Sequence, residues 1–298
     1  MKKTILFGGS GFLGSYVADE LTRRSYEVVI ADIKNSPYLS DKQSFILCDI
    51  MDPVAIKKVV KKADVVFNFA GLADIDESIQ HPKETFEKNV IGNINILEAC
   101  CEESIDRFVY ASSAYALSDK GSFYGISKLA SEKVIEEFQA RKNVPYTIVR
   151  YGTLYGERAD AQNGIYRILR QAVEHGEISH RGDGEAVREF IHAADAAQLS
   201  VDIIESQDHI NKPIVLTGVE RFKHKDLYQM INDILNGSVK ISFSGEPWEG
   251  HYQMTPYSVH PNLAKKLVPN PFIDLGQGLA QCIQHIYEEL QDDNCAAS

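Results

Sequence analysis

The residues best suited to chemistry lie between positions 112 and 128, where Tyr124 precedes Lys128 by four residues. Residues four apart on a helix share one face, with their Cβ atoms roughly 5–6 Å apart. A phenol beside an ammonium is a candidate acid/base pair. Lowering a tyrosine pKa from about 10 towards 7 requires roughly 4 kcal/mol. A lysine about 4 Å away supplies that much only at an effective dielectric constant near 20, so the pair needs a cleft that excludes most water.

The surroundings distinguish this pair from a second one with the same spacing, Tyr38 and Lys42, in a polar segment rich in Ser, Asp and Pro. Ser112 and Ser113 stand just past a strand-like run, and Tyr124 opens a helix-like pattern. Ligands of open α/β sheets bind outside the carboxyl ends of the strands. We therefore interpret the earlier pair as accidental and the later one as part of a site.

A glycine-rich turn near the start of the chain predicts a dinucleotide site. The apolar run Lys3–Phe7 leads into Gly8, Gly11 and Gly14, and helical periodicity follows over residues 16–24. Glycines at these positions permit a tight turn, close approach of backbone N–H groups to a pyrophosphate, and close packing of helix on strand. The helix N-terminus favours the anion.

The acidic residue Asp32 follows a second strand-like run, residues 27–31, and stands eighteen positions after Gly14. A carboxylate at this place can accept hydrogen bonds from the ribose hydroxyls of adenosine, whereas it would repel a 2′-phosphate. We therefore expect NAD, in preference to NADP, as the cofactor.

Strand-like runs and helix-like patterns alternate through the first half of the chain. This alternation predicts an α/β fold with a doubly wound parallel sheet of the Rossmann type. We expect residues 1–151 to form an NAD-binding domain, and residues 152–298 to form mainly a smaller substrate-binding α/β lobe, interleaved with the first. The further strand-like runs are residues 44–48, 64–69, 107–111 and 146–150, and the helix-like patterns are residues 53–62, 82–103 and 123–141.

The composition is that of an ordinary globular protein whose partners are small molecules. The 298 residues are 44% hydrophobic and 24% charged, which is enough for a sizeable core. A net charge of −11 argues against a general binder of nucleic acid or of anionic membranes, although it allows a local cationic site for a phosphorylated small molecule. No run approaches the roughly 20 apolar residues that span a membrane, and the cysteines lack metal-ligand spacing. We expect a cytoplasmic protein without a metal.

The second half contains one cluster of interest, around Arg188. This arginine could grip a phosphate through two hydrogen bonds, or it could simply pair with a neighbouring glutamate. His180 and His192 could be general bases, although a lone histidine is more often structural. The loop at residues 245–261 could form a lid or pocket wall, or merely pack on the surface. Its aromatic and imidazole side chains are Trp248, His251, Tyr252 and Tyr257.

Taken together, these residues resemble the extended short-chain dehydrogenase/reductase family, in particular its nucleotide-sugar epimerases and dehydratases, over nearly the whole chain. The resemblance implies NAD as cofactor. In it, Asp49-Ile50 matches the adenine contact, and Phe69-Ala70-Gly71 looks like the segment that lines the cofactor in UDP-galactose 4-epimerases. The positions that match cofactor contacts are Gly8, Gly11, Phe12, Leu13, Gly14, Asp32, Asp49, Ile50, Phe69, Ala70, Gly71, Asn89, Tyr124, Lys128 and Tyr151.

The same resemblance implies catalytic roles for three residues. Tyr124 matches the tyrosine that transfers the proton, and Lys128 matches the lysine that holds the nicotinamide ribose and lowers the tyrosine pKa. Ser113 matches the serine that hydrogen-bonds the reacting oxygen. The positions expected to contact substrate are Ser112, Thr153 and Arg188, the last of which matches the arginine that contacts the nucleotide diphosphate.

Departures from the family pattern narrow the reaction. Dehydratases that resemble this family carry an acidic residue after the catalytic hydroxyl residue, where Ala114 and Tyr115 stand here, so a 4,6-dehydratase is disfavoured. The cysteine of the enzymes that epimerise C3 and C5 is also absent near this position. Ser113 and Tyr124 are only eleven positions apart, so a loop usual in nucleotide-sugar enzymes is shortened. Thr153 replaces a family asparagine, and the substrate contacts must therefore differ.

We therefore expect an NAD-dependent enzyme that oxidises a secondary hydroxyl, at C4, of a nucleotide-linked sugar in surface polysaccharide (capsule or lipopolysaccharide) biosynthesis. If the hydride returns, the enzyme is an epimerase; if the 4-keto sugar leaves, it is a dehydrogenase. The alternative is an NAD-binding regulatory or scaffold protein with a vestigial site, against which the intact Ser113, Tyr124 and Lys128 argue. The resemblance also implies a homodimer, formed through the helices at residues 82–103 and 123–141.

Overall fold

The computed structural model describes residues 1–246, 250–256 and 264–296, with side chains up to Asp292. Within these residues, eight strands form one sheet in the order β13-β10-β6-β5-β4-β1-β2-β3, and each strand is parallel to its neighbours. The strand order reverses between β1 and β4, the place where doubly wound sheets bind ligands. The strands are β1 (Lys3–Phe7), β2 (Glu27–Asp32), β3 (Gln43–Leu47), β4 (Val65–Asn68), β5 (Arg107–Ser113), β6 (Tyr146–Tyr151), β10 (Lys212–Leu216) and β13 (Lys265–Leu267).

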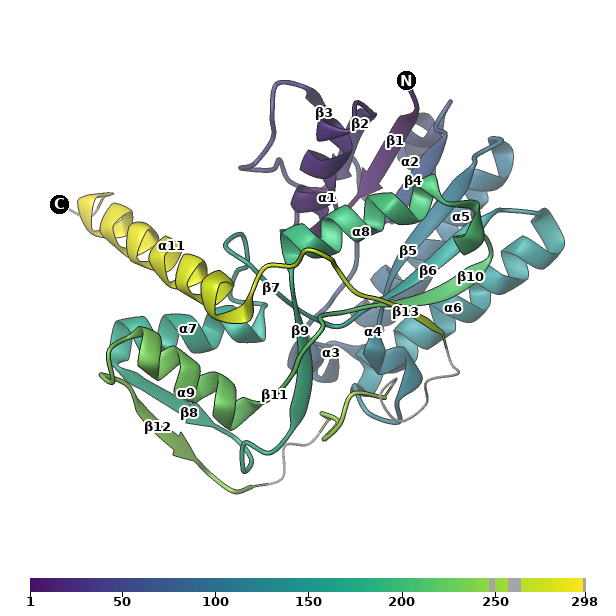
Figure 1. Ribbon diagram of the computed structural model, residues 1–298. Coiled ribbons are helices and arrows are strands. Elements are labelled where there is room, and N and C mark those ends of the chain that lie inside the picture. The colour runs from purple at the N-terminus through teal and green to yellow at the C-terminus, as the bar shows by residue number, and fades with distance from the viewer. Residues whose placement is uncertain (247–249, 257–263, 297–298) are drawn as a thin grey trace.

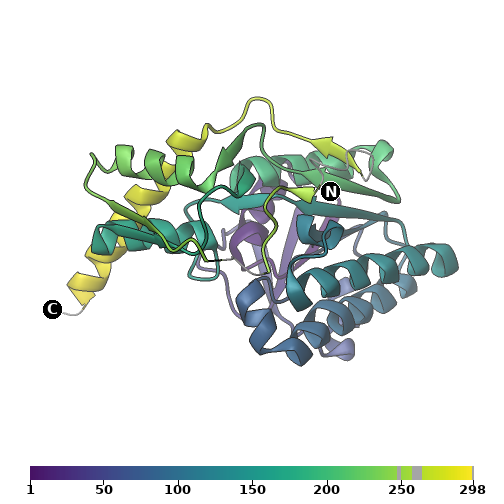
Figure 2. The same cartoon turned by 90° about the horizontal axis from the view of Figure 1, so that it is seen from below.

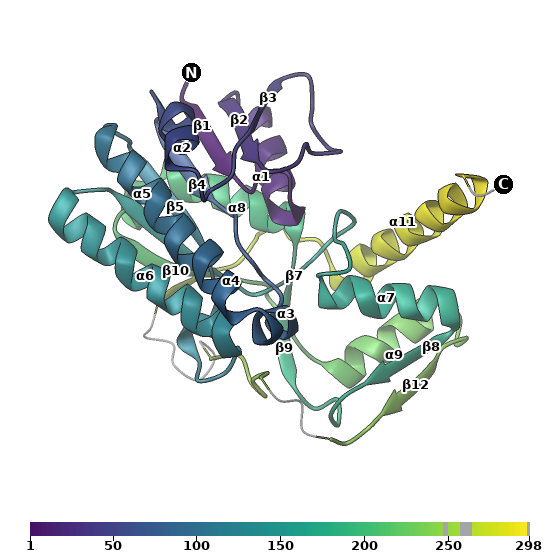
Figure 3. The same cartoon turned by 180° about the vertical axis from the view of Figure 1, so that it is seen from behind.

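Helices cover both faces of this sheet, which makes a three-layer sandwich (Figures 1 and 3). Along β1, Ile5 and Phe7 join the core beneath α2, α5 and α6, whereas Leu6 joins the core beneath α1 and α8, because strand side chains alternate between faces. Since both faces are covered, central strands such as β1 and β4 are nearly continuous buried runs. The helices are α1 (Phe12–Arg23) and α8 (Ala193–Glu205) on one face, and α2 (Pro53–Val60), α5 (Gly92–Glu102) and α6 (Ser122–Lys142) on the other.

The connection from β4 to β5 contains a helical irregularity. The predicted helix at residues 82–103 is present as α4 (Pro82–Phe86) and α5, joined by a π-helix at Glu87–Ile91. A shorter helix, α3 (Ile75–Gln80), precedes them. Such π turns are rare and often occur at functional sites.

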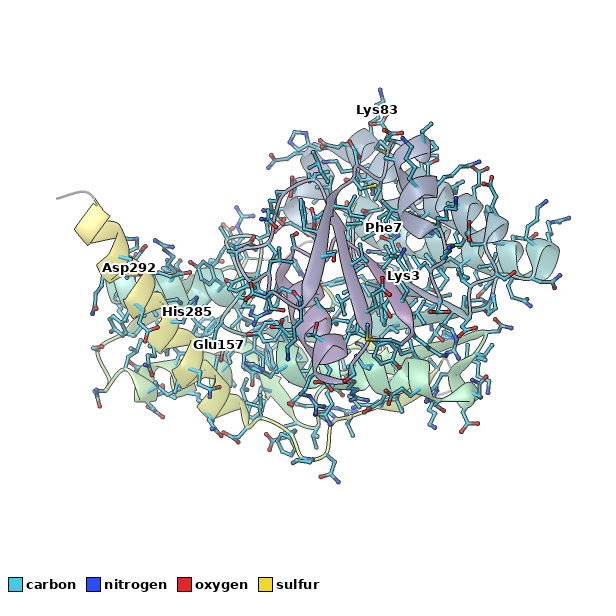
Figure 4. All side chains as sticks on the ribbon, turned by 90° about the horizontal axis from the view of Figure 1, so that it is seen from above. Lys3, Phe7, Lys83, Glu157, His285 and Asp292 are labelled. Carbon is cyan, nitrogen blue, oxygen red and sulfur yellow. The ribbon has the colours of Figure 1, made fainter. Side chains whose placement is uncertain are left out.

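A smaller lobe lies beside the sandwich (Figure 2). In its described part, β7, β9 and β11 form one small sheet and β8 and β12 form another. Tyr155, Leu227 and Leu279 belong to its own apolar core. In Figure 4, Lys3 and Phe7 mark the half with the large sheet, while His285 and Asp292 mark the course of α11. The lobe elements are β7 (Thr153–Tyr155), α7 (Gly164–His175), β8 (Glu177–His180), β9 (Val187–His192), β11 (Arg221–Lys223), α9 (His224–Ile234), β12 (Lys240–Phe243) and α11 (Leu275–Ala296).

The doubly wound parallel sheet predicted from the sequence is confirmed. The first helix begins earlier than predicted, at Phe12, directly after the glycine turn. After residue 151 the chain returns to the large sheet with α8, β10 and β13, while the division into a cofactor domain and a substrate lobe stays a prediction. In the described part of the chain, no helix is long and apolar enough to cross a membrane.

Candidate active site

The glycine turn after β1 is as tight as its sequence predicts. Gly8 has a φ of +73°, which favours glycine, and its N–H donates to Ala31 O at 3.0 Å. A Cβ at Gly8 would lie 2.5 Å from Ala70 N, and a Cβ at Gly14 would lie 2.4 Å from Gly8 O. The turn is therefore packed between the loop after β4 and the first turn of α1, and neither glycine has room for a side chain.

The start of α1 is open at this turn. Phe12 and Leu13 begin the helix after Gly11, which has no side chain to cap the first N–H groups. The first N–H groups of a helix lack intrahelical acceptors, and the helix dipole attracts negative charge to them. This arrangement fits a pyrophosphate.

Asp32 reaches the same turn from the end of β2. Its Oδ2 accepts a hydrogen bond from Ser10 N at 3.0 Å, and its Oδ1 accepts one from Ile33 N at 2.7 Å. Each carboxylate oxygen can accept a second bond. The carboxylate therefore retains capacity for the ribose hydroxyls of adenosine, and the residues of this corner fit a dinucleotide.

Asp49 and Ile50 follow β3 at the outer end of this corner. Ile50 packs on Gly92, where an added Cβ would lie 2.5 Å from Ile50 Cδ1. Its carbonyl accepts from Asn95 Nδ2 at 2.9 Å. Asp49 is exposed, and its Oδ1 accepts from Met51 N at 2.8 Å. An exposed carboxylate next to a buried apolar side chain is compatible with the expected adenine contact.

Asn89, in the π-helix, holds the loop Phe69-Ala70-Gly71 in place. Its Oδ1 accepts from Leu72 N at 2.8 Å, and its Nδ2 donates to Leu72 O at 3.0 Å and to Ser127 Oγ at 2.9 Å. A Cβ at Gly71 would lie 2.3 Å from Asn89 Oδ1. The sequence predicted that Asn89 binds the cofactor. Its buried amide is instead directed to these protein groups, which tie the loop to α6.

Ser113, Tyr124 and Lys128 come together where the end of β5 meets the start of α6. The Ser113 side chain is close enough to Tyr124 to act on its pKa, and Lys128 Nζ donates to Ala111 O at 2.8 Å. Lys128 Nζ lies 5.7 Å from the centre of the Tyr124 ring. All three residues are more than nine-tenths buried. The duplicate at Tyr38 lies in a turn between β2 and β3.

Burial moves both titrating groups of this site towards their neutral forms. It lowers the pKa of Lys128 to about 8, an effect that Glu132 opposes. It raises the pKa of Tyr124, an effect that the hydrogen bond with Ser113 opposes. Burial therefore outweighs the effect of Ser113 on the Tyr124 pKa, and the expectation that Lys128 lowers this pKa stays a prediction. The Lys128 ammonium donates its hydrogen bond to Ala111 O. A phenolate on Tyr124 would lose more stabilisation from water than the neighbouring protein groups supply.

Two residues expected to contact ligands direct their hydroxyls elsewhere. Ser112 Oγ donates to Glu132 Oε1 at 2.6 Å, because adjacent side chains on a strand point to opposite faces and Ser113 occupies the other one. Tyr151 Oη lies 2.7 Å from Ser200 Oγ of α8, within the core. The Ser112 hydroxyl thus serves the packing of α6, and the substrate contact expected of Ser112 stays a prediction.

Arg188 lies beneath aromatic side chains. It is 3% exposed, its guanidinium carbon lies 4.1 Å from the centre of the Tyr252 ring, and its charge lowers the pKa of Tyr115, which burial raises. The Tyr115 and Tyr252 rings are 4.6 Å apart, and Tyr115 Oη lies 2.8 Å from His251 Nδ1. The sequence analysis missed Tyr115 as a site residue, although its place two residues after Ser113 was a signal.

The described residues 250–256 form a wall that bridges the two halves of the site. Gly250 O accepts from Gly121 N at 2.8 Å, just before α6, and Gln253 O accepts from Val187 N at 2.8 Å, on β9. Between them, the Thr153 side chain lies close enough to Tyr252 to lower its pKa, which burial raises. The other two aromatic residues of the predicted loop, Trp248 and Tyr257, lie outside the described residues.

The two histidines considered as bases have structural contacts. His180 Nδ1 lies 2.8 Å from Tyr228 Oη. His192 Nδ1 accepts from Ala194 N at the start of α8, and its Nε2 lies 3.3 Å from Glu157 Oε2. Among the described residues, no group of three or more His, Cys, Asp or Glu side chains could hold a metal ion.

The chain is similar to known proteins over most of its length. Residues 4–217 match the sequence model of the NAD-dependent epimerase/dehydratase family. A putative UDP-glucose 4-epimerase of Methanocaldococcus jannaschii is 28% identical, over 94% of this chain and 96% of that protein. A UDP-N-acetyl-alpha-D-glucosaminuronate decarboxylase of Bacillus cytotoxicus is also 28% identical, over 98% and 99%. The crystal structure of UDP-glucuronic acid 4-epimerase from Bacillus cereus, in complex with UDP-glucuronic acid and NAD, has a TM-score of 0.85 at 22% identity, over 96% of this chain and 99% of that one.

The close packing of the glycine turn gives a testable difference between two glycines. Gly8 and Gly237 have nearly the same φ, +73° and +75°, but an added Cβ meets backbone only at Gly8. We expect Gly237→Ala to cost only the strain of about 1–2 kcal/mol, and Gly8→Ala to cost about 1–3 kcal/mol more through overpacking. Urea unfolding of both variants measures this difference. Equal losses of unfolding free energy would contradict the tight packing.

Proposed function

Because the chain belongs to the NAD-dependent epimerase/dehydratase family, we propose that it is an enzyme that oxidises a secondary hydroxyl, at C4, of a nucleotide-linked sugar. The keto sugar is then either reduced on its other face, as in an epimerase, or released, as in a C4 dehydrogenase. The names of the relatives, a UDP-glucose 4-epimerase and a UDP-sugar decarboxylase, support UDP-sugars as the substrate class.

One observation above all supports this proposal: Ser113 and Tyr124 are buried together beside Lys128, at the sheet edge that also contains the glycine turn. The turn and the trio are physically connected. Gly8 packs against Ala70, and the loop that contains Ala70 is tied through Asn89 to α6. A dinucleotide bound at the turn would extend along this connection towards the trio.

Each residue of the trio has one task in the proposed reaction. Tyr124 Oη takes the proton of the sugar hydroxyl, Ser113 Oγ orients the reacting oxygen, and Lys128 contributes positive charge that favours the phenolate. Bound NAD supplies the acceptor for the hydride. Because burial raises the pKa of Tyr124 in the protein alone, the phenolate forms only when further positive charge or hydrogen bonds reach this buried phenol.

Arg188 is the residue we assign to the nucleotide diphosphate. Tyr252 covers its guanidinium in the structure, so diphosphate binding requires this ring to give way. Dehydration is disfavoured, because the residues after Ser113 are Ala114 and Tyr115 and provide no acid. A regulatory protein that only bound NAD would not need the buried Ser113 and Tyr124. The cytoplasmic location and the place in surface polysaccharide biosynthesis stay predictions.

The reaction can be assigned by product analysis. The purified protein is incubated with NAD and UDP-glucose, UDP-N-acetylglucosamine or UDP-glucuronic acid, and the products are followed by mass spectrometry and NMR. Unchanged mass with inverted C4 identifies an epimerase, and loss of two hydrogens identifies a dehydrogenase. Loss of carbon dioxide from the uronic acid identifies a decarboxylase, as in one relative. Loss of water would show that the exclusion of dehydration is wrong.

The role of Tyr124 is tested by removing one oxygen atom. We expect Tyr124→Phe to lower kcat by about 10²- to 10⁴-fold, the usual contribution of a general acid/base, while NAD still binds. Tyr38→Phe is the matched control, since that residue has the same spacing to a lysine but lies in a turn. Full turnover in Tyr124→Phe would refute the mechanism.

The predicted homodimer is supported by an apolar stripe on the outer face of α6. Phe123, Ile126 and Leu129 are 38%, 56% and 41% exposed, and Ile91 on the neighbouring π-helix is 45% exposed. Large exposed apolar residues gathered on one face are typical of an interface. A two-fold dimer would bury this stripe against itself.

A charge in the middle of this stripe should break the dimer. We expect Ile126→Glu to give a monomer by sedimentation velocity, because a carboxylate buried against apolar groups is costly. Val54→Glu is the control, since Val54 is also exposed but lies on α2. If Ile126→Glu and the native protein have the same mass in solution, the proposed interface is wrong.

A further inference from the structure

Three residues of α6, spaced four apart, contact three consecutive residues of β5. Of these three α6 residues, the proposed function gives roles to the first two, and it leaves the third without one. Of the three β5 residues, it gives a catalytic role to the last. The three contacts are Tyr124 with Ser113, Lys128 with Ala111, and Glu132 with Ser112.

Glu132 is a fully buried carboxylate with strong partners. Its Oε1 accepts from Ser112 Oγ at 2.6 Å and from Arg150 Nε at 2.9 Å, and its Oε2 accepts from Arg150 Nη2 at 2.6 Å. Its side chain is 0% exposed, and that of Arg150 is 8% exposed. Bidentate pairs of this kind fix geometry as well as charge. Glu132 therefore joins α6 to both β5 and β6.

A purely stabilising role explains this pair poorly. Buried ion pairs are costly to desolvate, and apolar residues of similar volume often stabilise a fold as well or better. The position of Glu132 is more informative: it lies one helical turn beyond Lys128 on the same face of α6. A fixed negative charge there acts on the ammonium, and Glu132 raises the Lys128 pKa against the effect of burial.

We propose that Glu132 is a positioning residue, which holds the end of β5 through Ser112 and keeps the Lys128 ammonium charged next to Tyr124. This inference rests on the proposed function, in which a charged Lys128 is needed. It also gives Ser112 a task in place of the substrate contact predicted from the sequence.

The electrostatics around Lys128 agree with this assignment. Burial lowers its pKa to about 8, and Glu132 is the group that raises it. Around Nζ, Tyr110 of β5 and Tyr124 of α6 present their rings at 4.9 and 5.7 Å, and Arg150 of β6 lies on the other side of Glu132. Loss of the carboxylate would therefore lower the Lys128 pKa further and leave the charge of Arg150 uncompensated.

The direct test is an NMR titration of Lys128 in the native protein and in Glu132→Gln, with Lys128→Arg used to identify its signal. We expect the midpoint to fall by about one pH unit in Glu132→Gln, in the range typical for loss of a nearby opposite charge. At pH 8 the charged fraction would then fall from about a half to about a tenth, and the alkaline limb of kcat would move down with it. An unchanged midpoint would overturn the inference.

Ser112→Ala tests the same idea while keeping both buried charges, in case Glu132→Gln does not fold; it removes only the hydrogen bond from Ser112 to Glu132. We expect kcat for the UDP-sugar converted by the native enzyme to fall about tenfold with KM unchanged, because the β5 end loses its link to α6. Thr147→Val is the control: it removes a buried hydroxyl from the far end of β6, where Thr147 Oγ1 donates to His209 O. Native kcat in Ser112→Ala would count against positioning.

The titration also separates this inference from the proposed function. If the native protein converts none of the UDP-sugars, the function is wrong, yet the Lys128 midpoint still decides the role of Glu132. If the native protein is active and the midpoint does not move, the function stands and the role of Glu132 is refuted.

Discussion

Removal of water from the end of β5 is the constraint on which the rest of the site depends. A phenol and an ammonium buried together both shift towards their neutral forms, and the pKa values of Tyr124 and Lys128 shift accordingly. Proton transfer at neutral pH needs the charged states, a phenolate on Tyr124 and an ammonium on Lys128. The surrounding protein groups must therefore replace the stabilisation that water would give to these charges. The Ser113 side chain lowers the Tyr124 pKa and the charge of Glu132 raises the Lys128 pKa, so both act in that direction. The same low dielectric that raises the cost makes each of these compensating interactions stronger.

The sequence was informative where the structure is local. The strands, the glycine turn and the placement of Asp32 depend on short-range patterns, and the family resemblance extends the same logic to Ser113, Tyr124 and Lys128. The sequence was less informative about the direction in which individual side chains point. Whether Ser112 or Ser113 faces the site depends on which face of β5 lies against α6, and no spacing within the segment encodes this. The spacing that identified Lys128 also applies to Glu132, four residues further on, so that residue could have been found.

Contacts between distant parts of the chain could not be predicted from the sequence, for a different reason. Arg188 was expected to be open to a diphosphate, whereas Tyr252 and Tyr115 cover it. These residues come from β9, from the segment after β12 and from the turn after β5. The shortened connection between Ser113 and Tyr124 leaves space beside α6, and residues 250–256 occupy that side of the site. A deletion in one loop is thus accompanied by a wall from another, which only the three-dimensional arrangement shows.

The π-helix at Glu87–Ile91 sets the rotational phase of the helices around it. Each residue of an α-helix advances by about 100°, and a π turn accommodates one extra residue without breaking the helix. A deletion of one residue here could restore a regular helix, but it would rotate Asn89 away from Leu72 and Ser127. The alignment of the cofactor wall with α6 is therefore encoded by chain length as well as by side-chain identity. In laboratory evolution of this protein, this segment should tolerate substitutions of the half-buried Glu87 and Lys88 far better than insertions or deletions.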